Sequence, residues 1–164
     1  MIGGLRDRMA DLPSYATLAA GSLVWALLMG ASAWLSLTRA GWQTTQAVGT
    51  VAVVFAIGGL IAFPLAIAAA TLTGAQRPEK RFAAAFVALT VFSSGLAAAL
   101  YANQYRLYYS EWHGEPFSKL WTHQIVFTTL AAIYQFLAVG MRLYFPLGFA
   151  ALFLASLWFA RRRR

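Results

Sequence analysis

The sequence predicts an all-α integral membrane protein, folded as one bundle of four transmembrane spans. Of its 164 residues, 60% are hydrophobic and only 11% are charged, whereas a soluble globular domain carries about 25% charged residues. Uncharged runs recur along the chain, each close to the 20 or so residues that cross a hydrocarbon core about 30 Å thick. The length suits a single domain, 1–164, with no room for a separate soluble domain.

The first predicted span covers about 16–38, a run without a charged residue. A cleaved signal peptide competes with it, because small residues at 31–33 resemble a cleavage site. The apolar run continues through Leu37, which favours a retained span. Ser22, Ala26 and Gly30 recur every four residues, and such a stripe of small residues predicts close approach of a second helix.

The second and third predicted spans cover about 47–73 and 82–102, separated by a basic loop at 74–81. Pro64 lies inside the second span, where neighbouring helices can satisfy the carbonyl group that it leaves free, so we expect a mild kink rather than a break. Ala84, Ala88 and Gly95 supply small residues in the third span. A dense aromatic belt between Tyr101 and Trp112 marks its end at the level of the lipid headgroups.

The region after 116 is harder to divide. Residues 125–160 are almost all apolar, a stretch too long for one span and barely enough for two. Gly140 and Pro146 predict a break, because proline removes a backbone donor and clashes with the preceding turn. We therefore expect a last span at about 143–160, with 116–140 forming an interfacial helix, a re-entrant segment or an additional, fifth span.

Basic residues predict the orientation, since they gather on the cytoplasmic side of membrane proteins. With four spans and both termini cytoplasmic, nine basic residues lie inside and at most four outside; five spans give six inside and seven outside. The nine are Arg6, Arg8, Arg77, Lys80, Arg81 and Arg161 to Arg164, and the four are Arg39, Arg106, Lys119 and Arg142. Charge thus favours four spans. Arginine and alanine greatly outnumber lysine and isoleucine, which is typical of a GC-rich bacterial genome, so we expect a bacterial cytoplasmic (inner) membrane.

A polar stripe runs through the predicted helix at 116–140. Trp121, Thr128, Gln135 and Arg142 are seven residues apart, and Gln124 precedes Thr128 by four, so they share one helix face. Such a face turns toward protein or water: it either hydrogen-bonds neighbouring helices or lines a ligand or ion path. The candidate ligand- or lipid-binding residues are Arg142, Gln135, Thr128, Gln124, Trp121, Arg106 and Tyr105.

Arg142 needs a counter-charge or an aqueous exit if it lies within the membrane, because an arginine at a span centre costs about 2.5–3.5 kcal/mol. Glu111 and Glu115 lie on the same predicted side and are candidate partners. Alternatively, the long side chain reaches a lipid headgroup.

Only one cluster resembles a set of metal ligands: Glu111, His113, Glu115 and His123. Its spacing matches no helix-borne metal motif, so these four are weak candidates and we predict no metal, cofactor or catalytic residue. The chain has no cysteine, which excludes thiolate chemistry, and its acidic residues all lie outside the apolar runs, which argues against an ion-coupled carrier. The net charge of +8 is placed at the ends of spans, which argues against nucleic acid as a partner.

These observations favour a non-enzymatic inner-membrane protein that acts through helix–helix and lipid contacts. It would be an accessory or stabilising subunit of a larger complex, or a homo-oligomer, with membrane lipids and other membrane proteins as its partners. The alternative is a lipid or small-anion binding or transport protein with a pocket around Arg142 and the 101–123 loop. A membrane enzyme or metal protein that uses the Glu111–His123 cluster is the third hypothesis.

Overall fold

The computed structural model describes residues 11–42 and 45–162, and within them every regular element is a helix. The elements are α2 (Tyr15–Arg39), α3 (Thr45–Leu72), α4 (Pro78–Tyr109), the 3-10 turn η1 (Ser110–Trp112), α5 (Lys119–Ala138), the 3-10 segment η2 (Gly140–Tyr144) and α6 (Leu147–Arg161). The predicted all-α membrane bundle is confirmed. Arg6, Arg8, Arg163 and Arg164, which enter the charge count, lie outside the described residues.

Three helices, α2, α3 and α4, are long and apolar enough to cross a membrane. They match the first three predicted spans, and α3 continues through Pro64. The third helix differs from the prediction, since α4 runs beyond residue 102 to Tyr109. At about 1.5 Å per residue it is about 48 Å long, more than a hydrocarbon core requires. Residues 103–109 contain neither glycine nor proline, so the helix continues past the end of the apolar run.

Small residues set the distances between the long helices. A methyl group added to Gly30 of α2 would lie 3.1 Å from the carbonyl oxygen of Ala52 in α3, and one added to Gly58 of α3 would lie 3.1 Å from the amide nitrogen of Ala97 in α4. The stripe predicted at Ser22, Ala26 and Gly30 is buried as expected. In the third span, Gly95 has no atom within 4 Å of its added methyl group, and Ala97 is the residue that closely approaches α3.

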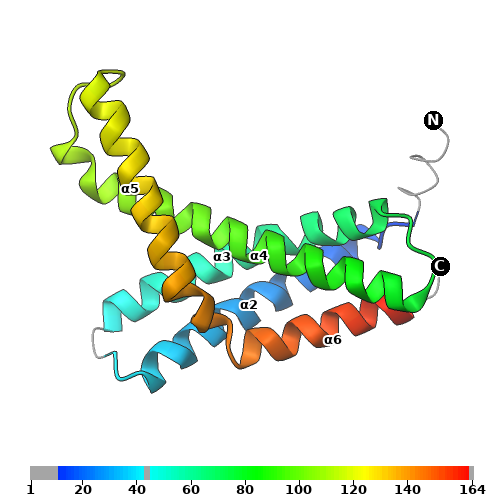
Figure 1. The fold of residues 1–164 in the computed structure, drawn as a ribbon. Coiled ribbons are helices and arrows are strands. Elements are labelled where there is room, and N and C mark those ends of the chain that lie inside the picture. Colours follow the sequence, from blue (N-terminus) through cyan, green and yellow to red (C-terminus); the bar gives the residue numbers. More distant parts are fainter. Residues whose placement is uncertain (1–10, 43–44, 163–164) are drawn as a thin grey trace.

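The last crossing is broken, as Gly140 and Pro146 predict. The helix in the 116–140 region begins at Lys119, after the Ser118 hydroxyl group accepts a hydrogen bond from the Trp121 amide at 3.1 Å. It ends at Ala138, and η2 leads into α6. Figure 1 shows α6 running along the bundle while α5 crosses it steeply and extends beyond it with the end of α4. At about 22 Å, α6 is too short to cross a hydrocarbon core alone, so a fourth crossing would also need residues that precede α6.

Serine hydroxyl groups from α2 satisfy the irregular backbone of this break. Ser32 Oγ donates a hydrogen bond to the Leu143 carbonyl group at 2.9 Å and accepts one from the Gly148 amide at 3.1 Å. Ser36 Oγ donates to the Phe145 carbonyl group. Non-helical backbone at membrane depth is tolerated only where protein or water satisfies it. Helix α2 therefore makes the break possible.

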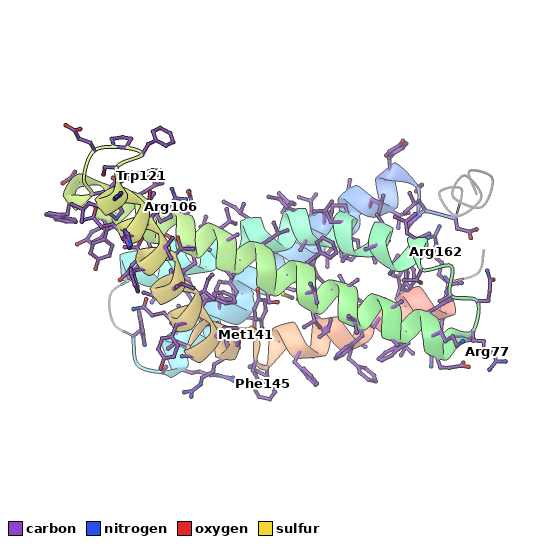
Figure 2. The ribbon with its side chains drawn as sticks, turned by 45° about the horizontal axis from the view of Figure 1, so that its top comes forward. Arg77, Arg106, Trp121, Met141, Phe145 and Arg162 are labelled. Carbon is purple, nitrogen blue, oxygen red and sulfur yellow. The ribbon has the colours of Figure 1, made fainter. Side chains whose placement is uncertain are left out.

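The beginning of the described chain and the end of α6 lie at the same end of the bundle. The Arg162 guanidinium group donates to the carbonyl oxygens of Asp11 and Leu12, both at 3.4 Å. Figure 2 shows Arg77 and Arg162 at this end and Arg106 and Trp121 at the opposite end. An even number of crossings gives this arrangement, in agreement with four spans rather than five. The assignment of this end to the cytoplasm stays a prediction from charge.

Candidate functional site

An apolar crevice opens beside the break in the last crossing. It has a volume of about 310 Å³ and is walled by α2, α4, η2 and α6. Its lining residues are Trp25, Met29, Phe86, Leu89, Thr90, Ser93, Ser94, Met141, Tyr144, Phe145, Gly148, Phe149 and Leu152. Phe145 and Phe149 are exposed at its edge, so the crevice reaches the surface of the molecule. We name it the α4–α6 crevice.

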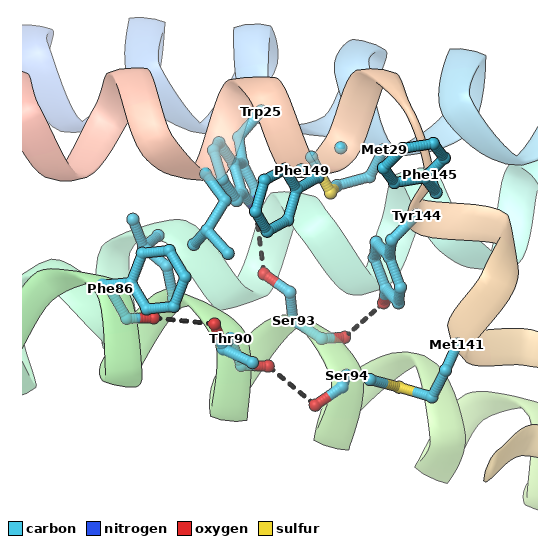
Figure 3. Close-up of a pocket in the computed structure, with 13 residues that line it drawn as sticks. Trp25, Met29, Phe86, Thr90, Ser93, Ser94, Met141, Tyr144, Phe145 and Phe149 are labelled. Atoms are coloured by element: carbon cyan, nitrogen blue, oxygen red, sulfur yellow. Dashed lines mark hydrogen bonds between the residues drawn. The ribbon is translucent and has the colours of Figure 1, made fainter.

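The polar side chains of the α4–α6 crevice are all hydrogen-bonded within the protein, as Figure 3 shows. Trp25 Nε1 donates to Ser93 Oγ at 3.0 Å, and the Tyr144 hydroxyl group donates to the Ser93 carbonyl oxygen at 2.8 Å. Thr90 and Ser94 each donate to a carbonyl group of their own helix. The lining contains no charged residue. Its surface is therefore suited to an apolar molecule.

A second, wider hollow runs between α2 and α6, with a volume of about 700 Å³. Its lining residues are Ala16, Thr17, Ala20, Gly21, Val24, Trp25, Leu28, Phe63, Ala151, Leu154, Ala155 and Trp158. Small residues of α2 and α6 form much of its two sides, and the Phe63 ring reaches it from α3 beside Gly21. We name it the α2–α6 groove.

The polar stripe predicted on α5 lies against α4 and the loop between them. The Tyr101 hydroxyl group of α4 donates to Gln135 Oε1 at 2.9 Å. Gln124 accepts a hydrogen bond from the Gly114 amide at 2.8 Å and donates to the Trp112 carbonyl group at 3.3 Å. The two glutamines thus join neighbouring segments, which agrees with the packing interpretation of the stripe.

The other stripe residues of α5 make local contacts. Thr128 Oγ1 donates to the Gln124 carbonyl group of its own helix at 2.7 Å. The Trp121 ring packs on the Phe117 ring, with centroids 5.2 Å apart. Phe117 has a positive φ of 66°, a left-handed conformation that is unusual for a bulky residue, and it lies in the turn that leads into α5.

Arg106 and Tyr105 lie on different sides of α4. Arg106 is half-buried near Trp121 (Figure 2), and its Nε atom is buried without a hydrogen-bond partner among the described residues. Tyr105 faces the start of α3, where it helps to line an interfacial hollow of about 530 Å³. Four tyrosines share that hollow: Tyr101, Tyr105, Tyr108 and Tyr109.

Arg142 is separate from the other candidates. Helix α5 ends at Ala138, so Arg142 lies in the 3-10 segment η2 and not on α5. The prediction that Arg142 shares one helix face with Trp121 is therefore wrong. Its side chain is exposed, and Arg142 is not among the lining residues of the crevice or the groove. Gln135 and Thr128 are likewise absent from the lining of both hollows, so neither one is the predicted pocket around Arg142.

The four weak metal candidates do not converge. Glu111, Glu115 and His123 are exposed, and His123 Nδ1 lies 2.6 Å from the Lys119 carbonyl oxygen of its own helix. His113 is half-buried in the turn, with Nε2 unpartnered within the described chain. Among the residues that the structure describes, no group of three or more such ligands is placed to hold a metal ion.

Comparison with known proteins identifies no relative: no family model matches the chain, and neither a curated protein nor a solved structure matches it significantly. Any functional interpretation therefore depends on the chain's own residues.

Sequence reasoning missed the crevice and the groove. Gly140 and Pro146 indicate where the last crossing breaks, and a break is a place where helices separate. Nothing in the sequence pairs Trp25 with Ser93, or Tyr144 with Ser93, because these contacts join residues 68 and 51 positions apart.

Proposed function

We propose that this chain is a non-enzymatic accessory or stabilising subunit of a membrane complex, and that the α2–α6 groove receives a transmembrane helix of another subunit. The groove supports this proposal by its lining. From Ala16 to Leu28 it follows α2 for about 18 Å, or roughly three helical turns. Its small side chains, among them Ala20 and Ala155, leave room for close approach of another helix, the arrangement typical of helix pairs in membranes.

A lipid chain is the competing occupant of the groove. Lipid fills any apolar surface at membrane depth and has no need of small residues along both walls. The groove borders Gly21 and its neighbour Ala20, and a side chain added at Gly21 would already meet the Phe63 ring at 2.3 Å. The bottom of the groove, where Gly21 meets Phe63, is therefore closely packed, whereas the small side chains of α2 and α6 leave the groove wide. A wide, shallow groove favours a broad occupant such as a helix over a single hydrocarbon chain.

Photochemical cross-linking tests the proposal. Val24 and Leu154 are 56% and 64% exposed and line the groove, whereas Val87, at 59%, lies on α4 outside it. A photoreactive benzophenone side chain at Val24 or Leu154 should give a discrete protein adduct in native membranes, and the same group at Val87 should not. An adduct of twice the chain's mass would identify a second copy as the partner.

The proposal is rejected if Val24 and Leu154 give lipid adducts only, or if Val87 gives the same protein adducts as the groove positions. Replacing Ala20 by Phe should fill the groove and abolish the adduct at Leu154, whereas Val87→Phe should preserve it. Retained helical circular dichroism would show that the Ala20→Phe variant is folded.

A further inference from the structure

The α4–α6 crevice lies near the middle of the apolar length of α2. Trp25, on its wall, is the eleventh of the 25 residues of α2, about 15 Å from the start of that helix. Gly148 and Leu152, in the first half of α6, line it from the other side. A hydrocarbon core about 30 Å thick that is centred on α2 would therefore place lipid tails, rather than headgroups or water, around the crevice.

The chemistry of the crevice favours an apolar ligand. The Ser93 hydroxyl oxygen accepts from Trp25 Nε1 and the Ser93 carbonyl oxygen accepts from the Tyr144 hydroxyl group, while Thr90 and Ser94 donate to their own helix. The donors of Trp25, Tyr144, Thr90 and Ser94 are thus already used within the protein, and a ligand that leaves its own polar groups unpaired pays a high cost in a medium without water. An apolar chain has no hydrogen bonds to lose by entering.

The shape of the crevice suits a flexible chain. Its volume of about 310 Å³ is at the lower end of the range of small-molecule pockets. Met29 and Met141 supply adaptable side chains to its wall, which adjust to occupants of variable shape. The exposed rings of Phe145 and Phe149 lie at the edge where a chain would enter from the bilayer.

We propose that the α4–α6 crevice holds a hydrocarbon chain of a membrane lipid, either an acyl or an isoprenoid chain, between α4 and the broken last crossing. Apart from Trp25, which lines both, this site shares none of its lining residues with the α2–α6 groove, and it does not depend on a protein partner. The lipid would fill the space that the break between α5 and α6 opens, and so hold η2 in place against α4.

Tryptophan fluorescence tests this proposal, because Trp25 lines the crevice and is only 3% exposed. The reporter protein keeps Trp25 and carries Phe at the other five tryptophans: Trp34, Trp42, Trp112, Trp121 and Trp158. In bilayers of phosphatidylcholine brominated in mid-chain, we expect Trp25 emission to fall to less than half of its value in unbrominated lipid. An isoprenoid alcohol added to the brominated bilayers would identify the isoprenoid form if it restored Trp25 emission by excluding the brominated chain.

Two variants of neighbouring residues sharpen the test. Thr90→Phe places a ring in the crevice, and Val91→Phe places the same ring on the exposed face of α4, where Val91 is 59% exposed. Quenching should be lost in Thr90→Phe and kept in Val91→Phe. Trp25 emission that is insensitive to brominated lipid, or equally quenched in both variants, would overturn the proposal.

A second measurement uses the chain with all its tryptophans, in case the reporter protein does not fold. Native mass spectrometry after detergent exchange should show a retained lipid on the natural sequence and on Val91→Phe. On Thr90→Phe the ratio of lipid-bound to lipid-free protein should be at least tenfold lower, which corresponds to about 1.4 kcal/mol of binding free energy. Equal retention by both variants would count against the crevice as the binding site.

Discussion

At the scale of single residues, Ser32 is the side chain on which the broken crossing most depends. It is fully buried, and its one hydroxyl group serves both the Leu143 carbonyl group before the break and the Gly148 amide after it. A buried backbone group that loses its partner keeps the cost of desolvation without the compensating bond.

We therefore expect Ser32→Ala to lower the free energy of unfolding by about 1–3 kcal/mol. Thr38→Ala is the matched control, because Thr38 is exposed and bonds only to its own helix, and it should change the value by less than about 0.5 kcal/mol. Both free energies of unfolding can be measured by reversible unfolding in mixed micelles with an increasing fraction of SDS. Equal stability of the two variants would show that water replaces the Ser32 hydroxyl group.

At the scale of helices, packing depends on where a small residue faces rather than on how many there are. Gly58 meets the backbone of Ala97 across the α3–α4 interface, whereas Gly95, on the same α4 helix as Ala97, faces open space. A side chain added at Gly58 must push two helix backbones apart, while one added at Gly95 meets nothing.

Gly58→Leu is accordingly expected to destabilise the bundle by about 1–3 kcal/mol through overpacking. Gly95→Leu should be neutral or stabilising by up to about 1 kcal/mol, because leucine is a better helix former than glycine. The same SDS titration compares them. A destabilised Gly95→Leu variant would indicate that this face is covered by another molecule.

The two sides of helix α5 also have different surroundings. Its polar stripe lies against α4 and the preceding loop through Gln135 and Gln124. The opposite side carries exposed apolar residues: Val126, Phe127, Leu130, Ile133, Tyr134 and Leu137. A continuous apolar face of this kind is typical of a helix whose outer side contacts lipid, which agrees with the steep course of α5 relative to the bundle.

At the scale of the whole molecule, the even number of crossings brings Asp11 and Arg162 together. The basic residues of the 73–77 loop and of the α4 start lie at this same end, as Arg77 shows in Figure 2. A cluster of positive charge at one end is the pattern of a cytoplasmic face, so we expect the opposite end, with η1 and the start of α5, to be external.

The absence of cysteine from the chain makes this orientation straightforward to measure. A single cysteine at Glu111, which is exposed in η1, should react with a membrane-impermeant maleimide in intact cells. One at Gln76, which is exposed in the loop before α4, should react only after permeabilisation. If the cysteine at Gln76 reacts in intact cells and the one at Glu111 does not, the topology is the inverse of the one expected. If both cysteines react in intact cells, the result contradicts four crossings.

The sequence by itself determined the class of the fold, the three long spans and the break at Gly140 and Pro146. These follow from composition, from run length and from the backbone chemistry of single residues, which are local properties. The position of Pro64 within an unbroken α3 also followed from the sequence, because neighbouring helices satisfy a carbonyl group that proline frees.

Only the tertiary structure decided which polar and small residues meet. The side chains of Gln135 and Tyr101, of Trp25 and Ser93, and of Ser32 and the Leu143 backbone come from different helices. Seven-residue spacing grouped Arg142 with Trp121, but α5 ends at Ala138 and Arg142 lies in η2, so the spacing does not place the two residues on one helix face. The crevice arises because the last crossing bends where its backbone is broken, and the shape of that bend is set by hydroxyl groups that α2 supplies.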